Sequence, residues 1–316
     1  MADESGLNPF VFPLQGGLVL DRSTFAMEPG MALELENFEP DTGGGYRRIN
    51  GFEKWNTNIV PQTASATEPV LMSAYFAGNN KVIAARGTSI YEAASGSGSW
   101  TSIDSGRSNA IRYSFDRYNL SGTELIVWAD GANNATKYDG TTVTDLNATG
   151  APANPKFVKH FKNALFFAGM SASPEEVVFT APYTDNDFSA ANGAGSIRVD
   201  SKVTALFPFR DELYIFAERI YKLVGNTIAD FVMQPVTRDI GCLNGFTVQE
   251  VAGEIIFLGR DGLRTVAGTA KINDVELGTI SRPIQELFEG ENDVDDFNSL
   301  VIPDKTQYRI FFSKPN

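Results

Sequence analysis

The sequence has one cysteine and one histidine among its 316 residues. Cys242 excludes a disulfide bond within the chain and permits a reducing compartment without requiring one. With no second cysteine and no histidine near it in the sequence, we do not expect Cys242 to act as a nucleophile. His160 lies between Phe157 and Phe161, so we expect a strand-packing role, and a single histidine excludes histidine-rich zinc sites.

The sequence also lacks long apolar runs and an excess of positive charge. No apolar run reaches the roughly 18 residues of a transmembrane helix, so we expect no membrane anchor. The N-terminal stretch MADESGLNPF is acidic and has no basic region, so we expect no signal peptide. The net charge of −13 argues against a surface that binds nucleic-acid phosphates. No amphipathic helical pattern is evident, whereas 29 glycines and 23 phenylalanines favour tight turns between aromatic-rich strands.

The stretch ELYIFAERIYKLVG, residues 212–225, predicts a β-hairpin, because two short apolar runs flank the polar pair Glu218 and Arg219. In its first strand, side chains on both faces are apolar. A strand with one exposed face alternates apolar and polar residues. We therefore expect this hairpin to lie between two other sheets.

Similar phrases recur along the chain at intervals of 40 to 53 residues. Their first apolar residues are Val82, Leu125, Leu165, Leu213, Ile255 and Tyr308. Most are preceded by another short apolar strand and a polar or glycine-containing pair, so each unit holds about four strands. This period is typical of β-propeller blades. The predicted fold is all-β, a propeller of about five to six four-stranded blades with an extended N-terminal arm; an irregular β-sandwich is the alternative.

We expect two parts: residues 1–55 as an arm and closing strand, and residues 56–316 as the propeller with an incomplete last blade. Blades are predicted near residues 71–105, 106–150, 151–200, 201–240 and 241–290. A strand is expected at residues 46–55 with a turn at Asn50 and Gly51. A short helix is expected from Ser281, as its cap, to Glu289, with Pro283 in the first turn.

The arm and the C-terminal strand are the predicted contact surfaces. The arm either packs on a neighbouring subunit or closes the ring of blades. The C-terminal strand is apolar, so the arm or another subunit should cover it. Arg47 and Arg48 alternate along a strand, so only one of them faces any one surface. A salt bridge to another subunit is the expected role, and a contact to DNA is the alternative. The predicted interface residues are Phe10, Phe12, Leu18, Leu20, Arg47, Arg48, Tyr308 and Phe311.

The residues form no convincing catalytic constellation, and we expect no enzyme activity, cofactor or metal. The acidic loops at residues 185–187 and 291–296 lack EF-hand spacing, so solvated loop charge is their default role, and Ca²⁺ binding through their oxygen atoms is the alternative. Residues 102–106, SIDSG, partly match the Asp-box turn of sialidase propellers. That turn is a folding motif, and it occurs once here.

The phrases at residues 12–55 and 238–268, followed by GTISRPIQELF, resemble those of tailed-bacteriophage virion proteins of the tail nozzle, or tail tubular protein B, type. The N-terminal part is the more specific, with a Gly-Gly arm, then Pro-Gly-Met, Asn-Phe-x-Pro and Gly-Gly-Tyr-Arg-Arg. Members of that family are generally longer and carry further domains, which leaves a shortened chain or a smaller relative open.

The resemblance implies a structural role in the virion tail, after assembly in the host cytoplasm. The implied partners are further copies in a ring, with a hexamer favoured, and tail or neck proteins such as the adaptor and fibres. Viral DNA would pass through the lumen without tight binding, and an acidic protein suits such a conduit.

A carbohydrate-binding or glycan-cleaving propeller that recognises the host surface is the alternative. In that case Trp100, Trp128 and Tyr138 would stack on sugars. The sequence has no repeated Trp/Asp set across its blades, which favours the structural role.

Overall fold

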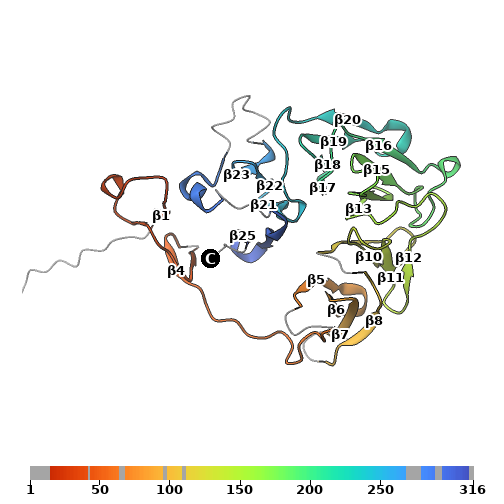
Figure 1. Cartoon of the computed structure of the whole chain (residues 1–316), viewed down its shortest axis with the longest axis horizontal. Helices are drawn as coiled ribbons and strands as arrows, with labels where there is room; N and C mark the ends of the chain where they lie inside the picture. The colour runs from red at the N-terminus through yellow and green to blue at the C-terminus, as the bar shows by residue number, and fades with distance from the viewer. Residues whose placement is uncertain are drawn as a thin grey trace, which may run out of the picture.

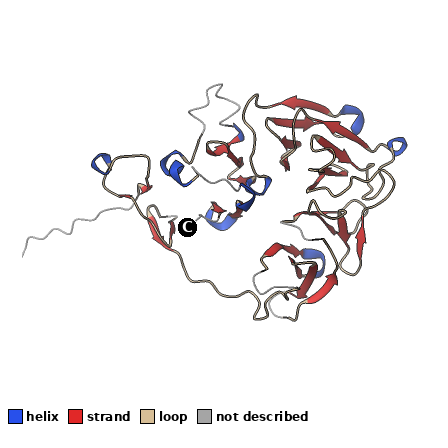
Figure 2. Cartoon of the chain, in the orientation of Figure 1, coloured by secondary structure: helices blue, strands red, loops and turns tan. Residues whose placement is uncertain are grey.

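The computed structural model describes residues 15–41, 43–63, 68–94, 98–108, 112–267, 279–288 and 294–312. Strands dominate, and the helices are short turns (Figure 2). The chain folds as a β-propeller whose antiparallel sheets follow one another around a ring (Figure 1). No helix in the described ranges is long and apolar enough to cross a membrane.

Four blades have four strands each, in sequence order across the sheet. The first holds β5 (Val70–Phe76), β6 (Lys81–Arg86), β7 (Ser89–Ala94) and β8 (Thr101–Asp104). The second holds β9 (Ser114–Tyr118), β10 (Leu125–Ala129), β11 (Thr136–Tyr138) and β12 (Val143–Asp145). The third holds β13 (Phe157–Phe161), β14 (Ala164–Ala168), β15 (Glu176–Phe179) and β16 (Gly195–Arg198). The fourth holds β17 (Ala205–Phe209), β18 (Glu212–Phe216), β19 (Ile220–Val224) and β20 (Val232–Pro235).

The last two blades are smaller in the described part of the chain. The fifth holds β21 (Gln249–Val251), β22 (Glu254–Gly259) and β23 (Gly262–Thr265). The sixth is the hairpin of β24 (Asn298–Ile302) and β25 (Gln307–Phe311). The C-terminal strand, for which we expected cover from the arm or another subunit, pairs with β24 of its own unit.

The arm forms two small sheets. β1 (Gly17–Leu18) pairs in parallel with β2 (Met31–Ala32), and β3 (Phe38–Pro40) pairs antiparallel with β4 (Tyr46–Arg48). The single-turn 3-10 helices are η1 (Thr24–Ala26), η2 (Ala77–Asn79), η3 (Ala190–Asn192), η4 (Ile228–Asp230), η5 (Gly245–Thr247), η8 (Val294–Asp296) and η9 (Pro303–Lys305). A longer 3-10 helix, η7, spans Arg282–Leu287.

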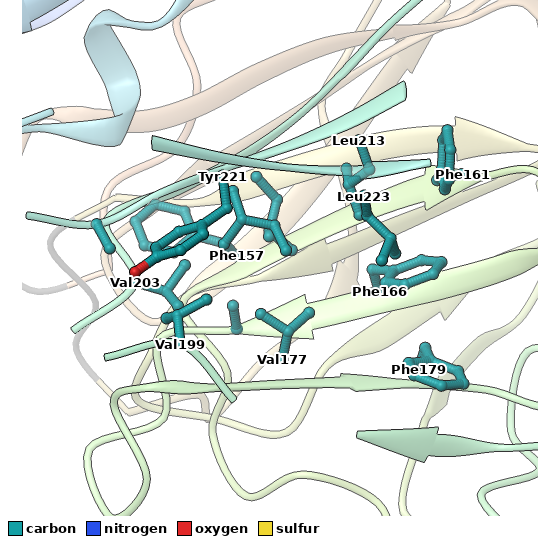
Figure 3. Close-up of a cluster of buried hydrophobic side chains, with 14 of the residues drawn as sticks. Phe157, Phe161, Phe166, Val177, Phe179, Val199, Val203, Leu213, Tyr221 and Leu223 are labelled. Atoms are coloured by element: carbon teal, nitrogen blue, oxygen red, sulfur yellow. The ribbon is translucent and has the colours of Figure 1, made fainter. Parts of the chain in front are cut away.

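The hydrophobic core consists of layers between neighbouring blades, as the two-sided hairpin predicted. Leu213 and Ile215 of β18 pack into the cluster shared with the third blade, which contains Phe166 and Phe179 (Figure 3). Tyr214 and Phe216 of the same strand pack into the cluster shared with the fifth blade. Burying each such aromatic side chain stabilises the fold by roughly 1.5–3 kcal/mol.

The blades are stacked so that their first strands contact one another, β5 with β9, β9 with β13 and β13 with β17. Five hydrophobic clusters lie between successive blades, from the first to the sixth. None of these clusters joins the sixth blade to the first. The arm and the segment at residues 49–63 lie at this end of the ring instead (Figure 1).

Two local predictions were wrong. The strand expected at residues 46–55 ends at Arg48, because its partner is the upstream β3 rather than a strand beyond Asn50 and Gly51. Ser281 makes no capping bond to η7. Its hydroxyl instead accepts a 2.9 Å hydrogen bond from the Leu263 amide, which ties the segment to β23.

Candidate interaction surface

The arm is folded onto the last part of the chain through a buried carboxylate, Glu39, on β3. Its cross-strand partner in register is Arg47, and their side chains form an ion pair of 3.0 Å. Glu39 also accepts from Lys305 at 2.7 Å and from Arg309 at 2.5 Å. The Glu39 side chain is only 3% exposed, so three cations converge on one shielded carboxylate.

These hydrogen bonds change the acidity of Glu39. The hydrogen bond from Lys305 lowers the pKa of Glu39 below its ordinary value of 4.5, and the bond from Arg47 adds to this effect, while burial acts in the opposite direction. The carboxylate is therefore charged at neutral pH. A further hydrogen bond joins the arm to the sixth blade next to Glu39. The side-chain amide of Gln307 donates to the backbone carbonyl of Pro40 at 3.1 Å.

Gly17 allows the arm to pass close to Tyr46 of the β3–β4 hairpin. Its φ of +68° lies in the left-handed region that favours glycine. A Cβ at this position would lie 2.5 Å from the Tyr46 hydroxyl. Two residues later the Val19 amide donates to Ala32, and the Leu20 amide donates to Pro283 at 2.7 Å. The arm thus contacts both η7 and the sixth blade.

A groove of about 750 Å³ lies between the arm and η7. Its apolar lining includes Leu18, Leu20, Leu33 and Leu35 from the arm and Leu287 from η7. Leu33 is 49% exposed. The carboxylates of Glu34, Glu36 and Glu286 also line it, and the lining described contains no lysine or arginine.

Exposed apolar side chains are concentrated in the arm and the linker that follows it. Thirteen large hydrophobic side chains are exposed in the described residues, and six of them lie between residues 25 and 59. They are Phe25, Leu33, Phe38, Phe52, Trp55 and Ile59. Phe25 is 100% and Phe52 85% exposed, so neither side chain packs into the hydrophobic core.

The predicted interface residues differ in their surroundings. Phe10 and Phe12 lie outside the described residues. Leu18 and Leu20 are half-buried in the groove, Arg47 is engaged by Glu39, and Arg48 is exposed. Their part in contacts with other chains stays a prediction.

The two C-terminal residues of the predicted set, Tyr308 and Phe311, lie on opposite faces of β25. Tyr308 faces the core between the fifth and sixth blades, where its hydroxyl donates to Thr247 at 2.8 Å, and burial raises its pKa. Phe311 is 48% exposed. Sequence reasoning missed Glu39, because an acidic residue on a short strand has no distinguishing pattern.

The aromatic residues considered for sugar stacking do not form a binding surface. Trp128 is 0% and Tyr138 1% exposed, so that hypothesis was wrong for both. Both pack between the first and second blades. Trp100 is half-buried, its ring lies 6.3 Å from Trp55, and its indole N–H donates to Asn58.

The titratable residues singled out in the sequence have structural partners. His160 lies on β13 with its ring stacked on Tyr118. Burial raises the pKa of the Cys242 thiol to about 12. Asp185 pairs with Lys137 at 2.9 Å, and Asp187 accepts from Ser189 and Asn192. Within the described residues, no group of three or more His, Cys, Asp or Glu side chains is placed to hold a metal ion.

No protein-family profile matches the sequence, and no curated protein matches it. Solved structures similar to it are β-propellers of low sequence identity. The WD40 domain of Neurospora crassa Pan2 has a TM-score of 0.40 and 15% identity over 62% of this chain and 61% of that one. The WD40 propeller of Doa1 has a TM-score of 0.39 and 14% identity over 61% and 62%. BBS1N, solved in complex with ARL6DN, has a TM-score of 0.41 and 10% identity over 62% of each chain. The chain thus spans less than two thirds of these structures, and the similarity extends to the fold alone.

Proposed function

We propose that this chain is a non-enzymatic structural subunit of a bacteriophage tail, of the nozzle or neck type. In this proposal copies assemble into a ring, with a hexamer favoured, around the path of the viral DNA. The arm and the sixth blade contact neighbouring copies and other tail proteins, such as the adaptor and fibres.

The observation that carries the proposal is the concentration of exposed apolar side chains at one end of the ring of blades. Exposed apolar side chains that gather in one region of a protein mark sites of contact with other molecules. Here Phe25 lies in the arm, and Phe52 and Ile59 lie in the linker that follows it. Glu39, between them in the sequence, binds this segment to Lys305 of the sixth blade. An anchored segment with exposed aromatic side chains is typical of a subunit contact, since aromatic residues are enriched at interfaces.

Two further observations support the tail assignment. The sequence resembles the nozzle family in this same arm, from the Gly-Gly pair to the Gly-Gly-Tyr-Arg-Arg phrase. The net charge of −13 suits a conduit, because cations that neutralise phosphates increase affinity and slow the passage of DNA.

The test is the mass of the purified chain in solution by light scattering, alone and with the tail components of a candidate phage. A ring, or a monomer that joins a ring when partners are added, is the expected result. The variant Phe25→Ser/Phe52→Ser should remain folded and lose assembly. The control Val232→Ser removes a 53% exposed side chain on the fourth blade and should assemble normally.

A folded monomer that binds none of the tail components would overturn the proposal. Specific binding to a glycan array, with no assembly, would favour the carbohydrate-binding alternative, which has lost two of its three proposed stacking residues to the core.

A further inference from the structure

The segment Leu33 to Glu36 is an irregular stretch between β2 and β3 whose backbone is unpaired beside the groove. It follows β2 directly and has the alternating sequence Leu-Glu-Leu-Glu. Hydrogen bonds join the flanking residues, as the Val19 amide donates to Ala32 and the Ile49 amide to Asn37. Among the described residues, no hydrogen bond joins the backbone of the four residues between them.

The side chains around this stretch have a defined chemistry. All four residues of the segment line the groove, with Leu18, Leu20 and Leu287 supplying further apolar surface. Glu34, Glu36 and Glu286 supply three carboxylates, and no ion pair joins them to another described residue. The groove therefore presents apolar contacts and uncompensated negative charge next to free backbone donors and acceptors.

We propose that this groove binds an extended segment of a partner polypeptide, which adds as a strand along residues 33–36 and carries lysine or arginine among apolar side chains. Backbone hydrogen bonds provide affinity in strand addition, and side chains that alternate between the two faces provide specificity. The basic side chains pair with Glu34, Glu36 and Glu286, and the apolar ones contact the leucines.

The N-terminal residues of this chain are a poorer match than a basic partner. They include Asp3 and Glu4 and no lysine or arginine, so their side-chain charges are of the same sign as those of the groove. The proposal concerns one groove of one chain and does not depend on a phage origin or on a ring. A monomer with no tail partners would leave it standing.

The probe is a fluorescein-labelled hexapeptide of alternating lysine and valine, titrated with the full chain and followed by fluorescence anisotropy. Saturable binding is expected, with amide hydrogen exchange slowed at residues 33–36. The same peptide with glutamate in place of lysine should bind at least about tenfold more weakly, because repulsion between like charges replaces each ion pair with the groove.

Charge reversal in the groove provides the matched test. Glu34→Lys/Glu36→Lys should weaken the lysine peptide by about tenfold and strengthen the glutamate peptide. The control Glu218→Lys/Glu250→Lys makes the same change in net charge at two exposed residues elsewhere and should change affinity by less than about twofold, because salt screens distant charges.

A peptide methylated on alternate backbone nitrogens separates strand addition from attraction to an acidic protein. Methylation along the edge that forms the ladder should abolish binding while leaving all charges in place. Equal binding of the methylated peptide, equal loss in the control variant, or no binding to the wild-type chain would each overturn the proposal.

Discussion

Glu39 and Lys305 are 266 residues apart in the sequence and form an ion pair of 2.7 Å. Arg309 donates to the same carboxylate, so two cations of the sixth blade bind one shielded side chain of the arm. None of the hydrophobic clusters joins the sixth blade to the first, so this contact holds the arm at the end of the ring of blades.

Replacing the anchor should release the arm without unfolding the blades. Glu39→Gln leaves Arg47, Lys305 and Arg309 without their shared anion, so we expect the Tm to fall by several degrees and amide exchange to accelerate in β1–β4. Thermal unfolding and hydrogen exchange by mass spectrometry measure both. Glu53→Gln, an exposed carboxylate in the following linker, is the control and should change neither. Unchanged exchange in β1–β4 of Glu39→Gln would contradict the anchoring role.

The same anchor predicts a pH dependence of stability. Because the folded-state pKa of Glu39 is lowered from 4.5, its contribution is fully present above that value and is lost as the pH falls through the folded-state pKa. The Tm difference between wild type and Glu39→Gln should therefore be constant near neutral pH and shrink in acid. A difference that grew on acidification would show that the carboxylate is not the stabilising form.

The phenylalanine cluster between the third and fourth blades should be sensitive to truncation. Phe166 is fully buried and its ring lies 5.2 Å from Phe179 and 5.9 Å from Phe161. Phe166→Ala should lower the free energy of unfolding by about 3–5 kcal/mol through lost burial and the cavity that remains. Denaturant titration measures this loss. Phe25→Ala, at a fully exposed side chain, should leave it unchanged.

The buried ion pair of Arg107 and Asp130 should hold the first two blades together. Their side chains are 5% and 0% exposed, the contact is 3.0 Å, and Arg107 also binds Asp104 of β8 at 2.8 Å. Arg107→Met leaves the Asp130 charge buried, so we expect a loss of about 3–5 kcal/mol of unfolding free energy. The control Arg219→Met breaks an exposed pair with Asp200 and should cost less than about 1 kcal/mol. Equal losses of unfolding free energy in the two variants would contradict the larger contribution expected of the buried ion pair.

Cys242 should be unreactive until the protein unfolds. It is 3% exposed, and burial raises its pKa to about 12, so little thiolate forms at neutral pH. Titration with a chromogenic disulfide should detect no thiol in the native chain and one after denaturation in guanidinium. Rapid reaction of the native chain would show that the blade around Cys242 opens.

The fold class and the approximate place of each blade follow from local patterns in the sequence. Each strand pairs with a neighbour close along the chain, so the pattern of ELYIF, two-sided and apolar, is visible locally and predicts β18 between two sheets. The repeat spacing predicts the other blades for the same reason.

How the ring ends depends on tertiary contacts. Glu39 has no periodic pattern, and its partners Lys305 and Arg309 lie at the far end of the chain, so only the folded path of the arm brings these charges together. The burial of Trp128 and Tyr138 also depends on tertiary packing. An aromatic side chain on a strand is buried or exposed according to whether another sheet packs against it.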